Sequence, residues 1–523
     1  MARQKSEDRV VPEGRRKAVP TWRVERPGGG KAVSVDERTG QLELFLGTAD
    51  SRTVQAARAD GVAGGDRSLP VAHAVPKPRT QDETILSATM EEVTKRLREA
   101  FQNVAANKGA SGPDRQSVDD VREHLDDVLP KLAAELLTGA YVPGAIRRVW
   151  IPKANGGQRG LGIPNVVDRV VQEAVRLVLE PIYEPTFHEA SHGFRPGRSC
   201  HTAIARAVGF MQMGYEWVVD LDLEKFFDKV NHQRLMARLA QRVDNQCLLT
   251  LIGRMLKAKV VMPDGVVVST EEGVPQGGPL SPLLSNIVLD ELDQELERRG
   301  HRFVRYADDC NIYVRSERAG QRVMTSVVSF IERRMRLRVN ATKSAVARPE
   351  ERHFVGFRLR REPLDGEVEV LLSKRSKKRI DAKIRELTPR NWGGSLDACI
   401  RRLNAYVLGW IGFFGICTTG IEATLRALDA HIRRRLRAIQ LKHWKTKRTI
   451  ARRLIKLGVA PRTAWRNVYG GRKSLWALSH SPAVDRGLRN AYFAERGLVS
   501  LAERWGVLAQ RIVAPAQLVL SLG

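Results

Sequence analysis

The spacing of apolar residues divides the chain into helical and extended stretches that alternate up to about residue 361. Four stretches place their apolar residues on one helical face, which predicts helices at 84–105, 117–138, 166–183 and 281–299. In the last of these, Ser281 is expected as the N-cap, with Pro282 in the first turn. Four other stretches are rich in β-formers or contain turn residues, and they predict strands or hairpins at 147–164, 217–223, 260–269 and 303–314. Helices that alternate with paired strands in this way predict an α+β domain.

The two ends of the chain differ from this central part. Residues 1–80 are rich in Gly, Pro, Ala, Arg and Asp, and show little periodicity apart from a short stretch at 41–46. We predict a mostly disordered N-terminal extension, with an arm that orders on RNA as the alternative. Beyond Ser373 the chain is predicted to be helical.

Charge adds a partner to this picture. The chain carries 87 Lys and Arg against 59 Asp and Glu, a net charge of +28, and residues 373–473 alone carry +21. Such an excess favours a polyanion, and nucleic acid fits better than an anionic membrane surface. No apolar run approaches the length of a membrane span, and the N-terminus lacks the apolar core of a secretory signal. None of the five cysteines forms a CxxC pair, so we expect a reducing, cytoplasmic location. If the polyanion is DNA, the chain would be nucleoid-associated while bound to it.

Carboxylates within apolar strands provide the candidate chemistry. Asp308 and Asp309 are adjacent at the tip of a predicted hairpin, where their charges repel unless a cation is present. Asp220 and Asp222 are two residues apart, so both project from the same face of one strand. Three carboxylates on one sheet form an oxygen-ligand site for Mg²⁺, and two such ions clamp the oxygens of a phosphoryl transfer.

Six segments resemble, in their order along the chain, the sequence blocks of group II intron-encoded reverse transcriptases and maturases. They are LGIPNVVDRVVQEAV (161–175), SHGFRPGRSCHTAI (191–204), WVVDLDLEKFFDKVNH (217–232), GVPQGGPLSPLLSNIVLDELD (273–293), FVRYADDCNIYV (303–314) and HFVGFRL (353–359). The resemblance covers about residues 84–500.

The resemblance implies a right-hand polymerase followed by a basic helical domain. Its parts would be an N-terminal extension at 1–80, fingers at 81–210, a palm with an antiparallel sheet at 211–362, a thumb or maturase RNA-binding domain at 370–472, and a DNA-binding-like segment at 473–523.

The resemblance also assigns the catalytic groups. Asp222, Asp308 and Asp309 would be catalytic, with Asp222, Leu223 and Asp308 as ligands of two Mg²⁺ ions and Mn²⁺ as an alternative ion. Asp222 is preferred to Asp220 because an aromatic residue, Phe227, follows it by five positions as in the family. Asp220 remains a second candidate.

The substrate contacts follow from the same comparison. The incoming dNTP would meet Lys153, Arg159, Gln276 and Phe227, the last as a steric gate against a ribose 2′-hydroxyl or, alternatively, as a core aromatic. Arg195 and Arg198 would contact the template strand. Trp465 and Trp476 are interpreted as structural aromatics, with DNA binding as the alternative. The basic stretch would bind RNA through Arg433, Arg434, Arg435, Lys442, Trp444, Lys445, Lys447 and Arg448.

The function implied is an RNA-directed DNA polymerase and intron maturase. Its partners would be group II intron RNA, an RNA template with a DNA or RNA primer, target DNA and dNTPs, without a membrane. A Cys- and His-bearing endonuclease domain is not expected, because the last Cys and His are Cys417 and His480 and show no metal-ligand spacing. Alternatives are a stand-alone host reverse transcriptase in DNA repair or phage defence, and a splicing-only RNA-binding maturase. A retron-type enzyme is disfavoured by the maturase-like C-terminal half.

Overall fold

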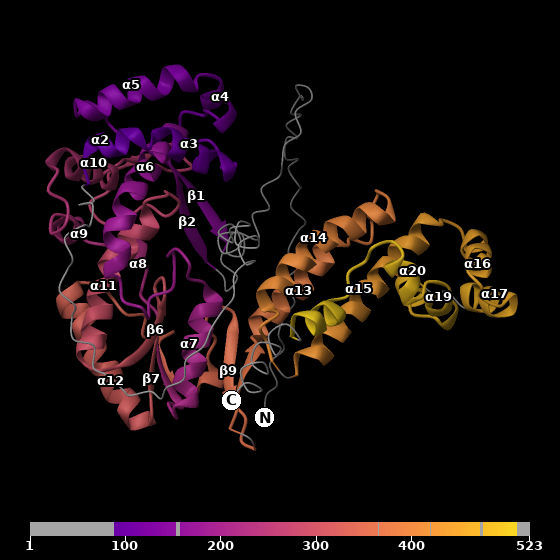
Figure 1. The fold of residues 1–523 in the computed structure, drawn as a ribbon. Helices are drawn as coiled ribbons and strands as arrows, with labels where there is room; N and C mark the ends of the chain where they lie inside the picture. The colour runs from indigo at the N-terminus through magenta and orange to yellow at the C-terminus, as the bar shows by residue number, and fades with distance from the viewer. Residues whose placement is uncertain (1–87, 153–156, 365, 419, 471–473, 510–523) are drawn as a thin grey trace, which may run out of the picture.

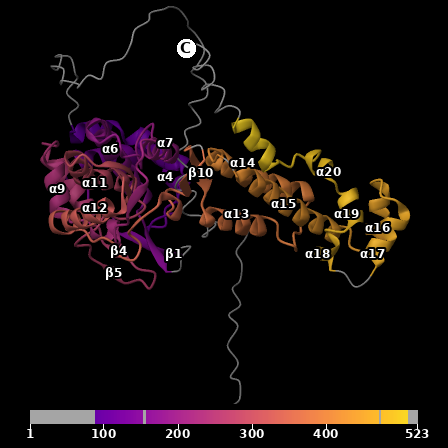
Figure 2. The same ribbon diagram turned by 90° about the horizontal axis from the view of Figure 1, so that it is seen from below.

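A computed structural model describes residues 88–509, apart from 153–156, 365, 419 and 471–473. The predicted N-terminal extension therefore lies outside the described residues, as does Lys153. Within them, the chain forms a mixed α/β body and a C-terminal arm of helices, defined here as α13 to α20, which projects from one side of the body (Figures 1 and 2). None of the helices in the described part of the chain is long and apolar enough to cross a membrane.

A four-stranded antiparallel sheet, the central sheet, organises the body. Its strand order is β6-β7-β3-β8, built from β3 (Trp217–Leu221), β6 (Arg302–Tyr306), β7 (Asp309–Val314) and β8 (Ala345–Ala347). The predicted strand-turn-strand at 303–314 is the β6–β7 hairpin, in which Tyr306 pairs with Asp309. The strand predicted at 217–223 is β3, which pairs with β7 on one side and β8 on the other.

A second sheet carries the hairpin predicted at 147–164. Its order is β2-β1-β4-β5, with β1 (Ile146–Pro152), β2 (Gln158–Ile163), β4 (Val260–Val261) and β5 (Val267–Val268). The hairpin predicted at 260–269 forms only two short strands, and β4 pairs in parallel with β1. No local pattern indicated that pairing, because more than a hundred residues separate the two strands.

The predicted helices of the body are present, two of them divided. The stretch 84–105 forms α2 (Met90–Lys95) and α3 (Leu97–Ala106), and 117–138 forms α4 (Val118–Glu123) and α5 (Leu125–Leu137). The long helices are α6 (Val166–Tyr183) and α11 (Ser281–Arg298). The expected Ser281 N-cap is wrong: Leu280 precedes the helix, and the Ser281 hydroxyl donates instead to the Pro275 carbonyl at 2.6 Å.

Shorter elements complete the body. They are η1 (Glu184–Thr186), α7 (Cys200–Gln212), α8 (Phe226–Lys229), α9 (His232–Leu239), α10 (Gln246–Leu256), α12 (Glu317–Phe330), the π-helical turn η2 (Ile331–Met335), η3 (Pro349–Glu351), and the antiparallel pair β9 (Phe357–Arg361) and β10 (Val368–Leu372).

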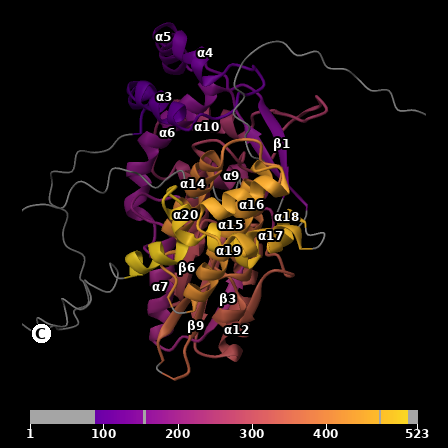
Figure 3. The same ribbon diagram turned by 90° about the vertical axis from the view of Figure 1, so that its right-hand side faces the viewer.

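The arm begins directly after β10 and is helical, as predicted. Its helices are α13 (Lys374–Leu387), α14 (Leu396–Phe414), α15 (Ile421–His443), α16 (Lys447–Lys456), α17 (Pro461–Tyr469), α18 (Leu475–Leu478), α19 (Pro482–Gly487) and α20 (Asn490–Ala494). The pair α16–α17 lies at the end of the arm farthest from the body (Figures 1 and 2), and Figure 3 views the arm from that end.

Each face of the central sheet belongs to a different hydrophobic core. Side chains alternate across a strand, so Val219 of β3 packs with α11 and α12 while Val218 faces the other way. The second face packs against α7, the β9–β10 pair and the arm helices in one continuous core that includes Trp410. The arm is therefore joined to the body through this second face, the back of the central sheet.

Candidate active site

The predicted catalytic carboxylates lie at one edge of the central sheet. Asp222 follows the last residue of β3, and Asp308 occupies the turn between β6 and β7. Because Leu221 pairs with Cys310, the end of β3 and this turn lie side by side. The backbone of Asp222 is fixed on both sides, since its amide donates to Ser344 Oγ at 3.0 Å and its carbonyl accepts from the Asn340 amide at 2.8 Å.

Negative charge is concentrated at this edge. Burial raises the pKa of Asp308, and the nearby Asp222 carboxylate raises it further, while Arg159 and Lys343 act in the opposite direction. Although part of Asp309 stays open to solvent, desolvation and the Asp308 charge raise its pKa as well. Carboxylates that raise one another's pKa are stabilised by a bound cation.

A lysine occupies part of this negative field. The Lys343 ammonium lies 3.0 and 3.2 Å from the two carboxylate oxygens of Asp222. The Lys343 side chain is 60% exposed, so it can leave Asp222 without exposing a buried surface. Sequence reasoning missed this residue, which lies more than a hundred positions from its partner.

Asp220 has a different role from its neighbour two residues away. Its carboxylate is bound by the Arg352 guanidinium at 2.6 and 2.7 Å, and the side chain is largely buried. The charge of Asp220 is thus neutralised within the protein. This arrangement favours Asp222 over Asp220 as the carboxylate of β3 that is available to a cation.

The fit of a divalent ion can be tested on these positions. Among the described residues, no three or more His, Cys, Asp or Glu side chains gather closely enough to form a ready-made cage. Mg²⁺ is usually held by one or two carboxylates together with substrate phosphates, so Asp222 and Asp308 meet that requirement. Leu223 lies opposite Val339 in a short antiparallel bridge, and the residues on either side of each make its two hydrogen bonds. The Leu223 carbonyl forms neither of these bonds.

Two loops and the β1–β2 hairpin converge beside the carboxylates. The Gly162 amide at the end of β2 donates to the Gln276 carbonyl at 2.7 Å. Gly277 has a φ of +124°, and a Cβ there would stand 2.4 Å from the Gly162 carbonyl oxygen, so only glycine fits this close approach. Arg159 of β2 is half-buried, and its charge partly offsets the rise in the pKa of Asp308 that burial causes.

Phe227 lies in α8, the single helical turn that follows β3. Lys225, with φ at +48°, turns the chain out of β3 into α8. Phe226 is buried and Phe227 is half-buried, with their rings edge to face at 5.3 Å. The Phe227 carbonyl accepts from the Val274 amide at 2.6 Å, which ties this turn to the loop that carries Gln276.

A buried arginine, missed by sequence reasoning, holds the β6–β7 turn that carries Asp308, called here the Asp308 turn. Arg305 of β6 is fully buried and pairs with Asp293 of α11 at 2.5 Å. It also donates to the Ala307 carbonyl in the turn at 2.9 Å and to Asn286 at 3.0 Å. Asn286 in turn donates to the Gly193 carbonyl at 2.9 Å. Ala307 has φ at +55°, so this network holds the turn in a conformation that alanine rarely adopts.

Two arginines predicted to contact the template both make hydrogen bonds within the fold. Arg195 is buried, pairs with Glu184 at 2.8 Å and donates to the carbonyls of His188 and Ser191. Its prediction as a nucleic-acid contact is wrong, because an irregular buried loop needs donors for its carbonyls. Arg198 is half-buried and donates to the Glu189 carbonyl at 2.6 Å.

The three consecutive arginines of α15 do not share a face. Arg435 is buried and donates to the hydroxyl and carbonyl of Thr388, each at 2.6 Å, so its assignment to RNA is wrong. Arg434 stacks on the Trp476 ring at 4.2 Å, and Arg433 is half-buried. Successive residues of a helix point about 100° apart, which separates these three side chains. Of the other residues predicted to bind RNA, Lys442, Lys445, Lys447 and Arg448 are exposed, while Trp444 packs against the arm core.

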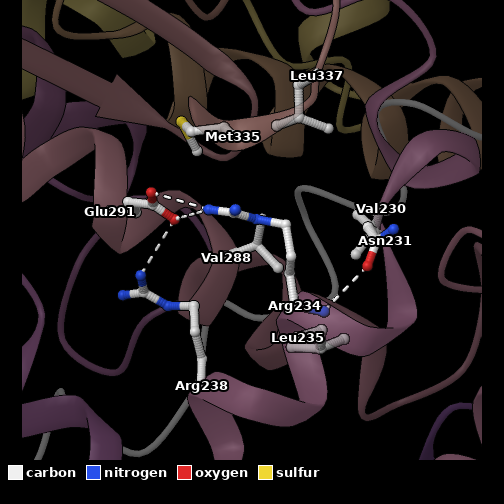
Figure 4. Close-up of a pocket in the computed structure, with 9 residues that line it drawn as sticks. All are labelled: Val230, Asn231, Arg234, Leu235, Arg238, Val288, Glu291, Met335 and Leu337. Atoms are coloured by element: carbon white, nitrogen blue, oxygen red, sulfur yellow. Dashed lines mark hydrogen bonds and ion pairs between the residues drawn. The ribbon is translucent and has the colours of Figure 1, made fainter. Parts of the chain in front are cut away.

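A small pocket between α9 and α11 lies apart from this site. There Arg234 and Arg238 both contact Glu291, the former at 3.0 Å (Figure 4). None of the predicted site residues lines it.

Comparisons with known proteins decide the family. Residues 151–359 match the family described as reverse transcriptase (RNA-dependent DNA polymerase), and residues 377–457 match the group II intron maturase-specific domain. Protein YkfC of Escherichia coli is 33% identical over 346 residues, which cover 58% of this chain and 88% of YkfC. The chain belongs to the group II intron-encoded reverse transcriptase and maturase family.

Other members of this reverse transcriptase and maturase family match shorter segments. The group II intron-encoded protein LtrA of Lactococcus lactis is 42% identical over 200 residues, covering 37% of this chain and 32% of LtrA. A putative COX1/OXI3 intron 2 protein of Saccharomyces cerevisiae is 36% identical over 202 residues, covering 38% of this chain and 23% of that protein. The matches thus span most of YkfC but a third or less of these two intron proteins. Among solved structures, a partial Cas6-RT-Cas1–Cas2 complex aligns with 51% of this chain and 46% of its own, at 25% identity and a TM-score of 0.31.

Membership confirms the family resemblance and the α+β fold with a helical C-terminal region. Reverse transcriptases use divalent metal ions, in agreement with the carboxylate pair at the sheet edge.

Proposed function

We propose that this chain is an Mg²⁺-dependent RNA-directed DNA polymerase that also acts as the maturase of a group II intron. The observation that carries the proposal is the meeting of Asp222 and Asp308 at one sheet edge, with Arg159 close to Asp308. The test is extension of a primed RNA template by the full chain with dNTPs and Mg²⁺. Absence of any extension would overturn the polymerase assignment.

Each residue of the site would have a defined task in this reaction. Asp222 and Asp308, with the Leu223 carbonyl, would hold two Mg²⁺ ions, for which Mn²⁺ could substitute, and Asp309 would add negative charge. When bound, the ions stabilise the attacking and leaving oxygens of the phosphoryl transfer. Arg159 and Lys153 would bind the triphosphate through charge-assisted hydrogen bonds. Lys343 would leave Asp222 as the site fills, which its exposed side chain permits.

Phe227 is proposed as the gate that selects dNTPs. Replacing Phe227 with alanine should raise incorporation of rNTPs relative to dNTPs by about tenfold or more, since removing the ring relieves a clash with the 2′-hydroxyl. Primer extension with each nucleotide type, compared as kcat/KM ratios, measures this. Phe226→Ala provides a contrast: its ring is buried, so its loss should lower stability without changing the nucleotide preference. An unchanged preference in Phe227→Ala would leave Phe227 as a core aromatic only.

The arm is proposed as the thumb that binds intron RNA and supports splicing, with target DNA as a further partner. Its exposed cations include Lys442, Lys445, Lys447 and Arg448, which lie at the end of α15 and the start of α16. The presence of Asp222 and Asp308 at a formed sheet edge argues against a splicing-only protein. Whether the DNA flanking the gene folds as a group II intron would distinguish a maturase from a stand-alone reverse transcriptase.

Salt dependence tests this basic surface. Replacing Lys442 and Lys445 together with glutamine should reduce the slope of log affinity for RNA against log salt by about two, or about one per phosphate contact. Arg426→Gln is the control, because Arg426 is exposed on the same helix but already paired with Glu422. A slope as steep as that of the parent chain in the double variant would exclude this surface.

A further inference from the structure

The far end of the arm displays two aromatic rings to solvent. Trp465 and Tyr469 of α17 are 37% and 50% exposed, although most aromatic side chains of the arm are packed into its core. They are one helical turn apart, and their ring centroids lie 5.4 Å apart at an interplanar angle of 34°. The rings thus form a small, nearly continuous apolar surface on the outside of the molecule.

Positive charge surrounds this surface. Arg462 and Arg466 are exposed on the same helix, and together with the two rings they occupy an arc of about 100°. The Lys447 ammonium of α16 lies 5.6 Å from the Tyr469 ring centroid. No Asp or Glu occurs between Asp429 and Asp485, so neither α16 nor α17 carries a carboxylate to balance these cations.

Other side chains of α17 make its contacts with the arm core. Ala464 and Val468 are buried, and they hold the helix against the arm core together with Leu454 of α16. Trp465 and Tyr469 project away from these contacts. Two large rings that stay partly exposed, on a helix that already has an apolar face, indicate a ligand in addition to any packing role.

We infer that Trp465 and Tyr469 form a stacking platform for unpaired bases of single-stranded RNA, with Arg462, Arg466 and Lys447 binding the adjacent phosphates. Aromatic rings interleaved with cations are the combination that single-stranded nucleic acids require, because rings stack on bases while cations follow the backbone. Duplexes offer no free base faces, whereas folded RNA presents unstacked bases in loops and bulges. We name this surface the distal platform. It deepens the proposed function, because it assigns a ligand to a specific part of the proposed RNA-binding arm.

The position of the distal platform limits which RNA segment it can bind. The helix α15, which leads toward it, has 23 residues and is therefore about 35 Å long. The platform lies at the opposite end of the arm from the central sheet (Figures 1 and 2). It would therefore hold a part of the RNA remote from the primer terminus, and not the bases being copied.

Binding of a stem-loop RNA to the full chain tests the inference without any nucleotide addition. We expect the double variant Trp465→Ala/Tyr469→Ala to lose affinity for the stem-loop by about tenfold or more, with little loss for the same RNA annealed to its complement. Trp465→Phe/Tyr469→Phe should retain most of the affinity, because phenylalanine still stacks. Leu475→Ala, which removes another exposed apolar side chain of the arm, is the matched control.

Three outcomes of this comparison between variants would overturn the inference. They are equal losses on the stem-loop and the duplex, no loss on either, or failure of the phenylalanine variant to restore binding when its thermal unfolding matches that of the parent. Single-stranded DNA of the same sequence is a further ligand to compare, because preference for DNA over RNA would contradict the RNA assignment. Because the binding test contains no dNTP, RNA affinity can be measured even if the chain has no polymerase activity. The failure of the polymerase proposal and the failure of this inference can therefore be distinguished.

Discussion

Replacing Asp308 with alanine should abolish incorporation of dNTPs on a primed RNA template while leaving RNA affinity nearly unchanged. The carboxylate is one of the two proposed metal ligands, and losing several kcal/mol of charge stabilisation in the transition state slows the reaction by about a thousandfold or more. The Asp308 turn lies at the edge of the central sheet, whereas α16, whose start carries exposed cations, lies at the far end of the arm. Single-nucleotide extension and a filter-binding titration measure the two quantities on the same preparations.

The neighbouring carboxylates of β3 provide a matched comparison. Asp222→Asn should fail as Asp308→Ala does, whereas Asp220→Asn should retain most of the rate, because Asp220 is already neutralised by Arg352. These two aspartates are only two residues apart in the sequence, so general effects on the strand would appear in both. Undiminished synthesis by Asp308→Ala, or equal losses at positions 220 and 222, would contradict the site assignment.

Replacing Arg305 with methionine should lower the free energy of unfolding by about 3–5 kcal/mol, because it leaves the fully buried Asp293 carboxylate without its partner. The urea dependence of unfolding measures this loss. Arg234→Met is the control: the Arg234–Glu291 pair of Figure 4 is partly exposed and should contribute less than about 1 kcal/mol. Similar losses in the two variants would show that the buried pair contributes no more than a surface pair.

A double variant separates the two tasks of Arg305. Arg305→Met/Asp293→Leu removes both charges, so most of the stability should return. The rate of dNTP incorporation should stay low, because methionine cannot donate to the Ala307 carbonyl and the Asp308 turn remains unsupported. Recovery of the rate together with stability would show that Arg305 is a structural residue only and does not position the turn.

Local patterns predicted the elements well where neighbouring residues decide the structure. The β6–β7 hairpin follows from apolar alternation on both sides of a short turn, and α11 follows from its apolar face. Contacts between distant segments were not predictable in this way. The pairing of β1 with β4, the Lys343–Asp222 ion pair and the Arg305–Asp293 pair all depend on how separate elements pack.

Charged residues were the main source of error, for a physical reason. Arg195 and Arg435 were predicted to bind nucleic acid because they lie in basic or loop segments, but the fold uses both to satisfy buried carbonyls. Composition cannot distinguish a guanidinium that faces solvent from one that completes a core. One signal was available for Arg305: a charge between two apolar positions of a strand must be paired once the strand is buried.

The shared core behind the central sheet has a consequence for how this molecule can be divided. Val218, Val304 and Tyr313 of the sheet are buried by α7, the β9–β10 pair and the arm helices in one cluster with Trp410. A chain cut after β10 would leave this face of the sheet partly uncovered, on the strands that carry the carboxylates. The proposed polymerase and RNA-binding activities therefore do not reside in interchangeable modules: an arm from another family member could be transplanted only together with the residues that line the back of the sheet.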